Sequence, residues 1–227
     1  MSHMERVSVA FLVVVTFVAV LVKVTWGGVQ AAPAPSSAAP QSAVGTVVVT
    51  GDAINLRGAP NRSASVLARA ERGSELELLS TQQDWYNVRW GEGTVWLSKL
   101  YASPTEDCPA GQAATPEGLR RRLTGEWKGE VQGRPATFVF YTRGERLCAY
   151  VLYDNVKEAF DVEEAGSGAL NLAGKRYERL AGTNGDFSLD RFSGQLEDAS
   201  GRLAGTFIDA KNHQGQWSAE RQGSSSG

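Results

Sequence analysis

Hydrophobic and polar residues alternate in short runs along most of the chain, a pattern that predicts β-strands. In "SELELLS" (Ser74–Ser80), Leu76 and Leu78 share one face and the glutamates between them share the other. In "DWYNVRW" (Asp84–Trp90), two alternating sets of side chains likewise separate onto opposite faces. Gly, Asp and Pro residues punctuate such runs over residues 46–101. Five short strands in so short a segment predict a small β-barrel.

Residues 115–222 repeat this β pattern after a short helix, which we expect over "TPEGLRRRL" (Thr115–Leu123) with Thr115 as its N-cap. Strand-like runs such as "PATFVFYT" and "RLCAYVLY" follow, joined by short connections rich in Gly, Asn and Asp. Such connections favour antiparallel hairpins. We therefore predict about eight strands in an up-and-down barrel or a strongly curved meander, followed by a flexible tail over 223–227.

The first hydrophobic run does not alternate. "VSVAFLVVVTFVAVLV" (Val7–Val22) has no charge, and Lys23 and Trp26 follow it at positions suited to a membrane interface. We expect residues 1–26 to form a single-pass helix in the cytoplasmic or inner membrane, with all later residues in the periplasm or extracellular space. The alternative is a cleaved signal peptide, but the apolar run is longer than the usual hydrophobic region of one.

Two segments have the composition of linkers. "GGVQAAPAPSSAAPQSAVG" (residues 27–45) is rich in Ala, Pro and Ser and carries no charge, so we expect a semi-extended tether. "ASPTEDCPAGQAA" (residues 102–114) separates the two β regions. The fold class is therefore mainly β, with an N-terminal transmembrane helix, a small barrel over 46–101 and a larger antiparallel β domain over 115–222.

Charge and cysteine content restrict the possible partners and the compartment. The chain has 23 basic and 25 acidic residues, so no overall basic field favours nucleic acid as a partner. The two cysteines, Cys108 and Cys148, lack the spacing of a metal or CxxC motif. In an exported protein an even count predicts one disulfide, and two independent buried thiols are the alternative.

The sequence carries no catalytic signature. His3 and His213 are the only histidines, and we expect His213 in an exposed hairpin loop. The adjacent carboxylates Glu163 and Glu164 would point to opposite faces of a strand, so they do not form an acid–base pair. No metal-binding, nucleotide-binding or nucleophile motif is present. We therefore expect no enzyme activity, no metal and no cofactor.

Several motifs in residues 46–101 resemble the bacterial SH3 domain family. The chain contains "INLRGAP" (Ile54–Pro60), then "VLARAERGSELELL", "WYNV" and "VWLSKLY", in the order that the family shows. It departs from the family pattern at Val95, where a Gly usually precedes the last Trp. The resemblance implies an SH3-like barrel and a binding or docking role in the cell envelope. It does not specify one ligand.

The C-terminal region resembles calycin-type barrels in its first strand, "LTGEWKGE", and in its closing segment, "GTFIDAKNHQGQW". Barrels of that type carry a Gly-x-Trp in the first strand. This resemblance implies a barrel whose interior could hold a small ligand.

Candidate partner-binding residues lie in the SH3-like region. We expect Leu56 to point into the barrel, and the polar residues on either side of it to face outwards. The region also holds more aromatic residues than a core of its size can enclose, so some must be exposed, as is typical of interfaces. The candidates are Asn55, Arg57, Trp85, Tyr86, Trp90, Trp96 and Tyr101.

Together these features predict a non-catalytic, membrane-anchored docking or scaffold subunit outside the cytoplasm. Its partner would be a larger membrane complex, such as an energy-transducing assembly, which it would stabilise as an accessory subunit. One alternative is an envelope protein that binds peptidoglycan through the SH3-like region. A further alternative is a small-ligand binder that uses the interior of the C-terminal barrel.

Overall fold

The computed structural model of the protein describes residues 42–108, 114–165, 168–180, 187–197 and 201–222. The predicted transmembrane segment, including Lys23 and Trp26, and the tether up to residue 41 lie outside these residues. The tail over 223–227 does so as well. Among the helices of the described ranges, none is long and apolar enough to cross a membrane.

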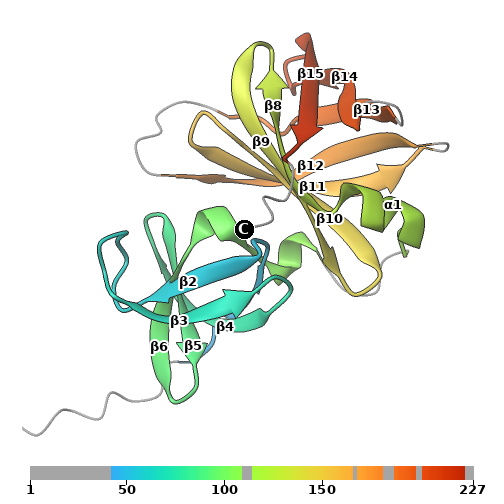
Figure 1. The fold of residues 1–227 in the computed structure, drawn as a ribbon. Helices are drawn as coiled ribbons and strands as arrows, with labels where there is room; N and C mark the ends of the chain where they lie inside the picture. Colours follow the sequence, from blue (N-terminus) through green and yellow to red (C-terminus); the bar gives the residue numbers. More distant parts are fainter. Residues whose placement is uncertain (1–41, 109–113, 166–167, 181–186, 198–200, 223–227) are drawn as a thin grey trace, which may run out of the picture. The chain divides into compact units, whose positions relative to one another are not determined.

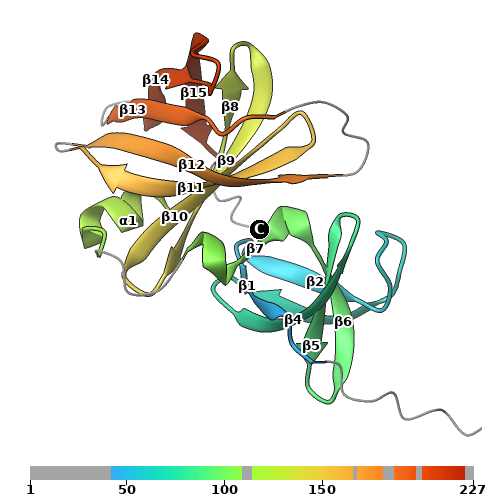
Figure 2. The same cartoon turned by 180° about the vertical axis from the view of Figure 1, so that it is seen from behind.

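The first β region is a seven-stranded antiparallel sheet with the strand order β3-β2-β6-β5-β4-β1-β7 (Figures 1 and 2). Its strands are β1 (Gly45–Val49), β2 (Ala53–Arg57), β3 (Val66–Glu71), β4 (Glu75–Gln82), β5 (Trp85–Trp90), β6 (Gly93–Ser98) and β7 (Ala102–Pro104). The alternation of apolar and polar residues along the strands determines which side chains form the core of this sheet. Leu76 and Leu78 are buried as expected, and Leu56 is fully buried.

The end of this region differs from the sequence prediction. The small barrel was expected over 46–101, but its strand β6 stops at Ser98 and the 3₁₀-helix η1 (Lys99–Tyr101) follows. The Ser98 hydroxyl accepts a hydrogen bond from Leu100 N, which favours the turn over a continued strand. The expected linker then begins with ordered structure, since β7 pairs with β1 and is followed by a second 3₁₀-helix, η2 (Thr105–Asp107).

The second region begins with the helix α1 (Glu117–Leu123) and continues as a closed eight-stranded barrel. Every neighbouring pair is antiparallel, and closure comes from the pairing of the last strand with the first. The strands are β8 (Gly125–Val131), β9 (Arg134–Arg143), β10 (Arg146–Tyr153), β11 (Val156–Glu164), β12 (Ala169–Arg179), β13 (Arg191–Glu197), β14 (Arg202–Ile208) and β15 (Gln214–Arg221). Of the two arrangements expected from the sequence, an up-and-down barrel or a strongly curved meander, the structure shows the barrel.

The predicted N-cap of α1 is wrong. Pro116, without a side-chain cap, precedes the helix, and the Thr115 hydroxyl instead accepts a hydrogen bond from Leu147 N of β10 at 3.0 Å. Thr115 therefore ties the chain before the helix to the barrel wall. Leu119 and Leu123 bury the apolar side of the helix in the barrel core.

Aromatic side chains fill the interior of the barrel. The Phe192 ring lies 5.3–5.9 Å, between ring centroids, from those of Phe138, Phe160, Phe207 and Trp217. A Cβ at position 194 would lie 2.4 Å from the Trp217 indole, so Gly194 leaves the space that this ring occupies. The interior that a ligand carrier would need is therefore occupied by the protein's own side chains.

Candidate partner-binding surface

One row of side chains crosses five strands on the outer side of the first sheet. The pairings β3–β2, β2–β6, β6–β5 and β5–β4 place Val66, Arg57, Trp96, Asn87 and Ser80 directly opposite one another in turn. Residues paired in this way point to the same side of a sheet. The register therefore brings together two predicted candidates, Arg57 and Trp96, which are 39 positions apart in the sequence (96 − 57).

Arg57 and Asn55 have structural contacts at this surface. The Arg57 Nη1 donates to the Ala64 carbonyl at 2.7 Å and so closes the loop between β2 and β3. The Asn55 side-chain oxygen accepts from Arg69 Nε at 3.2 Å. Both predicted residues are half-buried and flank the enclosed Leu56, which agrees with the outward direction expected for them. Arg57 thus positions the loop and leaves only part of its side chain open to a partner.

A β-bulge exposes two aliphatic side chains beside Arg57. Leu56 pairs with Ala68 and Arg57 with Val66, so Leu67 is the extra residue of β3. The exposed fractions are 46% for Val66 and 59% for Leu67. Sequence reasoning missed both, because they begin an ordinary apolar strand and nothing in the sequence marks the bulge. We call Arg57, Val66, Leu67 and Trp96 the outer patch.

The remaining aromatic candidates divide between the surface and the interior. Trp90, at the end of β5, and Tyr101, in η1, are 39% and 43% exposed and lie outside the row. Trp85 is buried, and Tyr86 is fully buried. The expectation that Trp85 and Tyr86 offer surface to a partner is therefore corrected. Tyr86 shares the inward side of β5 with Val88, so it forms part of the core of the first sheet.

Tyr86 reaches through that core to the barrel. Its hydroxyl donates to Glu178 Oε2 of β12 at 2.8 Å, and Lys99 Nζ lies 3.1 Å from the other carboxylate oxygen. Burial alone would raise the pKa of Glu178, but the nearby ammonium groups of Lys157 and Lys99 hold it below its ordinary value. Burial, and then the Glu178 carboxylate, raise the pKa of Tyr86. The hydroxyl therefore remains a hydrogen-bond donor to a charged carboxylate.

Lys157 forms a second connection between the first sheet and the barrel. This buried β11 side chain donates to the carbonyl of Lys99 at 3.1 Å and also to that of Ala102. Its ammonium lies 4.2 Å from the centroid of the Tyr150 ring. Burial lowers the pKa of Lys157 to about 8. Lys157 thus donates to carbonyl groups at the start of η1 and just after its end.

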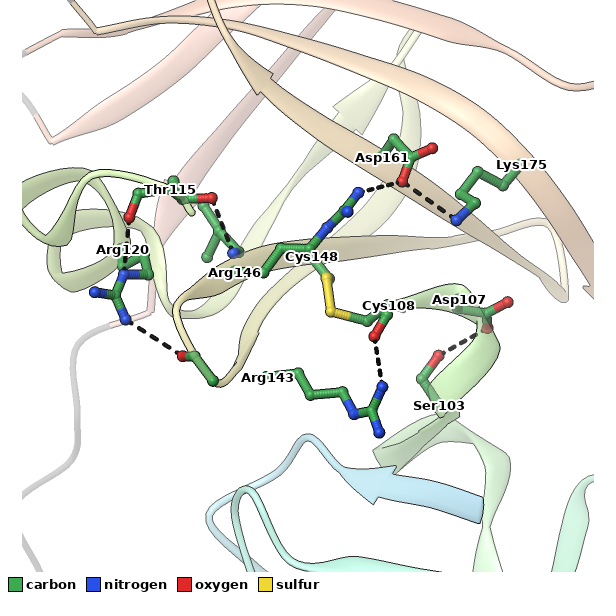
Figure 3. The surroundings of a disulfide bond; sticks show 12 residues. Ser103, Asp107, Cys108, Thr115, Arg120, Arg143, Arg146, Cys148, Asp161 and Lys175 are labelled. Carbon is green, nitrogen blue, oxygen red and sulfur yellow. Dashed lines mark hydrogen bonds and ion pairs between the residues drawn. A yellow bond between two sulfur atoms is a disulfide. The ribbon is translucent and has the colours of Figure 1, made fainter. Parts of the chain in front are cut away.

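A disulfide and an ion pair fix the chain that follows β7. Cys108 and Cys148 form the predicted disulfide, which joins the end of η2 to β10 (Figure 3). The preceding Asp107 accepts two hydrogen bonds from Arg176 of β12, at 2.8 and 2.9 Å. The Ser103 hydroxyl also donates to Asp107. Arg176 and Glu178 of β12 therefore both make contacts with residues of the first β region.

A polar cluster interrupts the apolar interior of the barrel. Glu158 Oε2 lies 2.7 Å from the Tyr153 hydroxyl, which also lies 3.0 Å from Asp190 Oδ2. The other oxygen of Glu158 accepts from Asp190 N at 2.7 Å. Burial raises the pKa of Glu158 to about 7 and also raises that of Asp190. Since the hydroxyl has one proton to donate, two ionised carboxylates would compete for it.

The described residues contain no group of three or more His, Cys, Asp or Glu side chains placed to hold a metal ion. His213 is exposed and pairs with Asp209, with 2.9 Å between Nδ1 and Oδ2. Glu163 and Glu164 are both exposed at the end of β11. His213 and Asp209 thus form a local surface contact.

The comparisons with known proteins agree with the architecture of the first sheet. Neither a curated protein nor a solved structure matches the chain. A family match begins just before β2 and ends within β7, so it leaves β1 outside and includes the outer patch and Tyr86. Residues 52–103 match the model of the family described as the bacterial SH3 domain.

Proposed function

We propose that this chain is a non-catalytic docking protein that binds a partner protein through the outer patch of its SH3-like sheet. The supporting observation is the exposure of Leu67 and Val66 beside Trp96 and Arg57. Exposed aliphatic and aromatic side chains with an adjacent Arg have the composition of a protein interface core. Protein interfaces derive most of their affinity from a few such residues.

The barrel would serve as a rigid base for this surface. Tyr86, Lys99 and Asp107 make their polar contacts to β12, and Val48 of β1 packs with Tyr141 and Tyr150 of the barrel, so this part of the SH3-like region is already occupied within the chain. The outer patch, on β2, β3 and β6, is left for a partner. This division explains why the binding surface is proposed on β2, β3 and β6 rather than at Tyr86.

In this proposal the protein is anchored by the apolar segment Val7–Val22 and acts outside the cytoplasm. The sequence of that segment supports the anchor, and the disulfide between Cys108 and Cys148 supports an oxidising compartment. An anchored docking protein of this kind suits an accessory subunit that stabilises a larger membrane complex, such as an energy-transducing assembly.

Peptidoglycan is the second candidate partner, supported by the bacterial SH3 match over residues 52–103. Trp96 provides an aromatic surface on which a sugar ring could stack. The aliphatic pair Val66 and Leu67 favours protein over glycan, since a glycan offers mainly hydroxyl groups to its binding site.

One experiment separates the two candidates. The full chain is purified from native membranes in a mild detergent and analysed on a native gel, and in parallel it is incubated with purified sacculi. A protein partner predicts a large assembly that Leu67→Ser disrupts and the control Leu189→Ser, at a barrel residue of 38% exposure, leaves intact. Sedimentation with sacculi that is abolished by Trp96→Ala would instead favour peptidoglycan. A chain that migrates as a monomer on the native gel and does not sediment with sacculi would contradict both proposals.

A further inference from the structure

A cleft of about 850 Å³ lies apart from the outer patch, on the side of the first sheet where β1 turns into β2. Its first wall includes Thr50, Gly51 and Asp52, and its second wall comes from β8, β9 and the end of β15. Ligand sites commonly have volumes of about 300–1,000 Å³ and often occur where two domains meet. The cleft therefore has the size and the location of a binding site.

The floor of the cleft is held by hydrogen bonds. The Tyr150 hydroxyl donates to the Leu100 carbonyl at 2.7 Å, and its oxygen lies 2.9 Å from Thr50 Oγ1. Thr50 N donates to the Tyr101 carbonyl at 2.9 Å. These contacts fix η1 and the end of β1 relative to the barrel wall, so a ligand would meet a preformed surface.

Tyr101 and two glycines shape the opening. The Tyr101 ring lines the cleft and is 43% exposed, although its backbone is bound to Thr50. Gly51 and Gly125 line opposite walls, where the Ile54 side chain lies 2.4 Å from the position of a Cβ at residue 51 and the Arg221 guanidinium lies 3.5 Å from that of a Cβ at residue 125. Gly125 has a φ of 135°, which an L side chain rarely adopts.

Charge distinguishes the two walls. On the first wall Arg72 pairs with Asp52 at 2.8 Å, and on the second wall Lys128 pairs with Glu126 at 2.5 Å. Arg221 lies over the Trp127 ring and donates to the Thr124 carbonyl. Within the described part of the chain, no carboxylate pairs with Arg221. One guanidinium therefore faces the cleft with its charge uncompensated.

From these features we infer that the cleft binds an extended peptide segment of a partner, with an acidic side chain placed at Arg221. Tyr101 offers its exposed ring to an apolar side chain of that segment, next to the acidic one. Arg binds carboxylates through charge-assisted hydrogen bonds. This site is separate from the outer patch, so the protein would have two contact surfaces for partners.

The test uses the full chain in detergent and a displayed library of random ten-residue peptides as the probe. We expect the selected peptides to be enriched in Asp or Glu and to lose about tenfold in affinity with Arg221→Met, as for one charge-assisted hydrogen bond. Tyr101→Ala should also weaken binding. Lys211→Met, which removes an exposed charge outside the cleft, and Leu67→Ser, in the outer patch, should leave the affinity unchanged.

Two outcomes would overturn the inference. One is selection of peptides whose binding is lost with Leu67→Ser and kept with Arg221→Met, which would assign them to the outer patch. The other is a library without any enriched sequence. The thermal unfolding of each variant is recorded alongside, and the conservative change Arg221→Lys should restore part of the affinity if charge is the cause.

Discussion

The Tyr86 hydroxyl of β5 donates to the Glu178 carboxylate of β12 at 2.8 Å, so a core residue of the SH3-like sheet is bound directly to the barrel. Lys99 approaches the same carboxylate from η1, at 3.1 Å. Glu178 thus has one partner on a strand and another on the 3₁₀-helix that follows the sheet. We expect this carboxylate to couple the stability of the two β regions.

Replacing Tyr86 with Phe tests that coupling. Phe keeps the packing of the ring but leaves a buried carboxylate with one donor fewer, so the free energy of unfolding should fall by about 1–3 kcal/mol. Denaturant titration of the full chain measures the change. The matched control is Tyr101→Phe, whose side chain is exposed and should give less than about 0.5 kcal/mol. Equal effects of the two variants would show that the Tyr86 hydroxyl has no special role.

The disulfide should contribute strongly to stability, because it closes a loop between residues 40 positions apart. In the chain-entropy model a loop of that length corresponds to about 4 kcal/mol. We expect the double variant Cys108→Ala, Cys148→Ala to lose an amount of that order in a denaturant titration. A reducing agent should destabilise the unmodified chain and leave the double variant unaffected. If reduction changes neither midpoint, the disulfide contributes no stability.

The Glu158 cluster predicts a dependence of stability on pH. The pKa of Glu158 is about 7 in the folded chain and lower when the chain is unfolded, so the folded state binds more protons between these values. Stability from this group is therefore fully present below about pH 4.5 and is lost as the pH rises through 7. Asp190, whose pKa is also raised, contributes in the same direction.

Glu158→Gln should remove most of this dependence. The Gln oxygen can still accept from Asp190 N, and its amide can donate to the Tyr153 oxygen, which frees the hydroxyl proton for Asp190. We expect the variant to be more stable than the unmodified chain by about 1–3 kcal/mol at pH 8 and nearly equal to it at pH 5. Unfolding curves at the two pH values measure this difference. A variant that is less stable than the unmodified chain at pH 8 would contradict the claim that Glu158 and Asp190 compete for the proton of the Tyr153 hydroxyl.

Leu67→Ser should separate binding from stability. Leu67 is the extra residue of a bulge and is 59% exposed, so its replacement should change the free energy of unfolding by less than about 0.5 kcal/mol. Binding to the partner should nevertheless fall at least about tenfold, as for a residue at the centre of an interface. The two quantities come from thermal unfolding and from co-purification at a series of concentrations. A loss of binding that follows a loss of folding would mean that Leu67 is structural.

Alternation and turn residues allowed much of the fold to be predicted from the sequence. Leu56, Leu76 and Leu78 are buried as expected, and the hairpin connections of the C-terminal region correctly predicted an antiparallel barrel. The pairing of the only two cysteines also followed from composition and the expected compartment. These are local or compositional signals, and they do not depend on which strands meet.

The rest could not be predicted, because it depends on register and on contacts between the β regions. Tyr86 looked like one of several surplus aromatic residues until its strand placed it opposite Glu178. The exposure of Leu67 follows from a one-residue bulge, which the sequence does not mark. Lys157 lies in an ordinary charged stretch, and only the fold places it beside the carbonyl groups of η1.

The central claim, that the outer patch binds a partner protein, is tested most directly by site-specific photo-cross-linking in native membranes. A photoreactive phenylalanine analogue replaces Leu67 in one strain and Leu189, on the barrel, in another. The account predicts a discrete cross-linked protein adduct with the probe at position 67, lost when Trp96→Ala is added, and no such adduct at position 189. An absence of adduct at 67, or the same adduct at both positions, would contradict it.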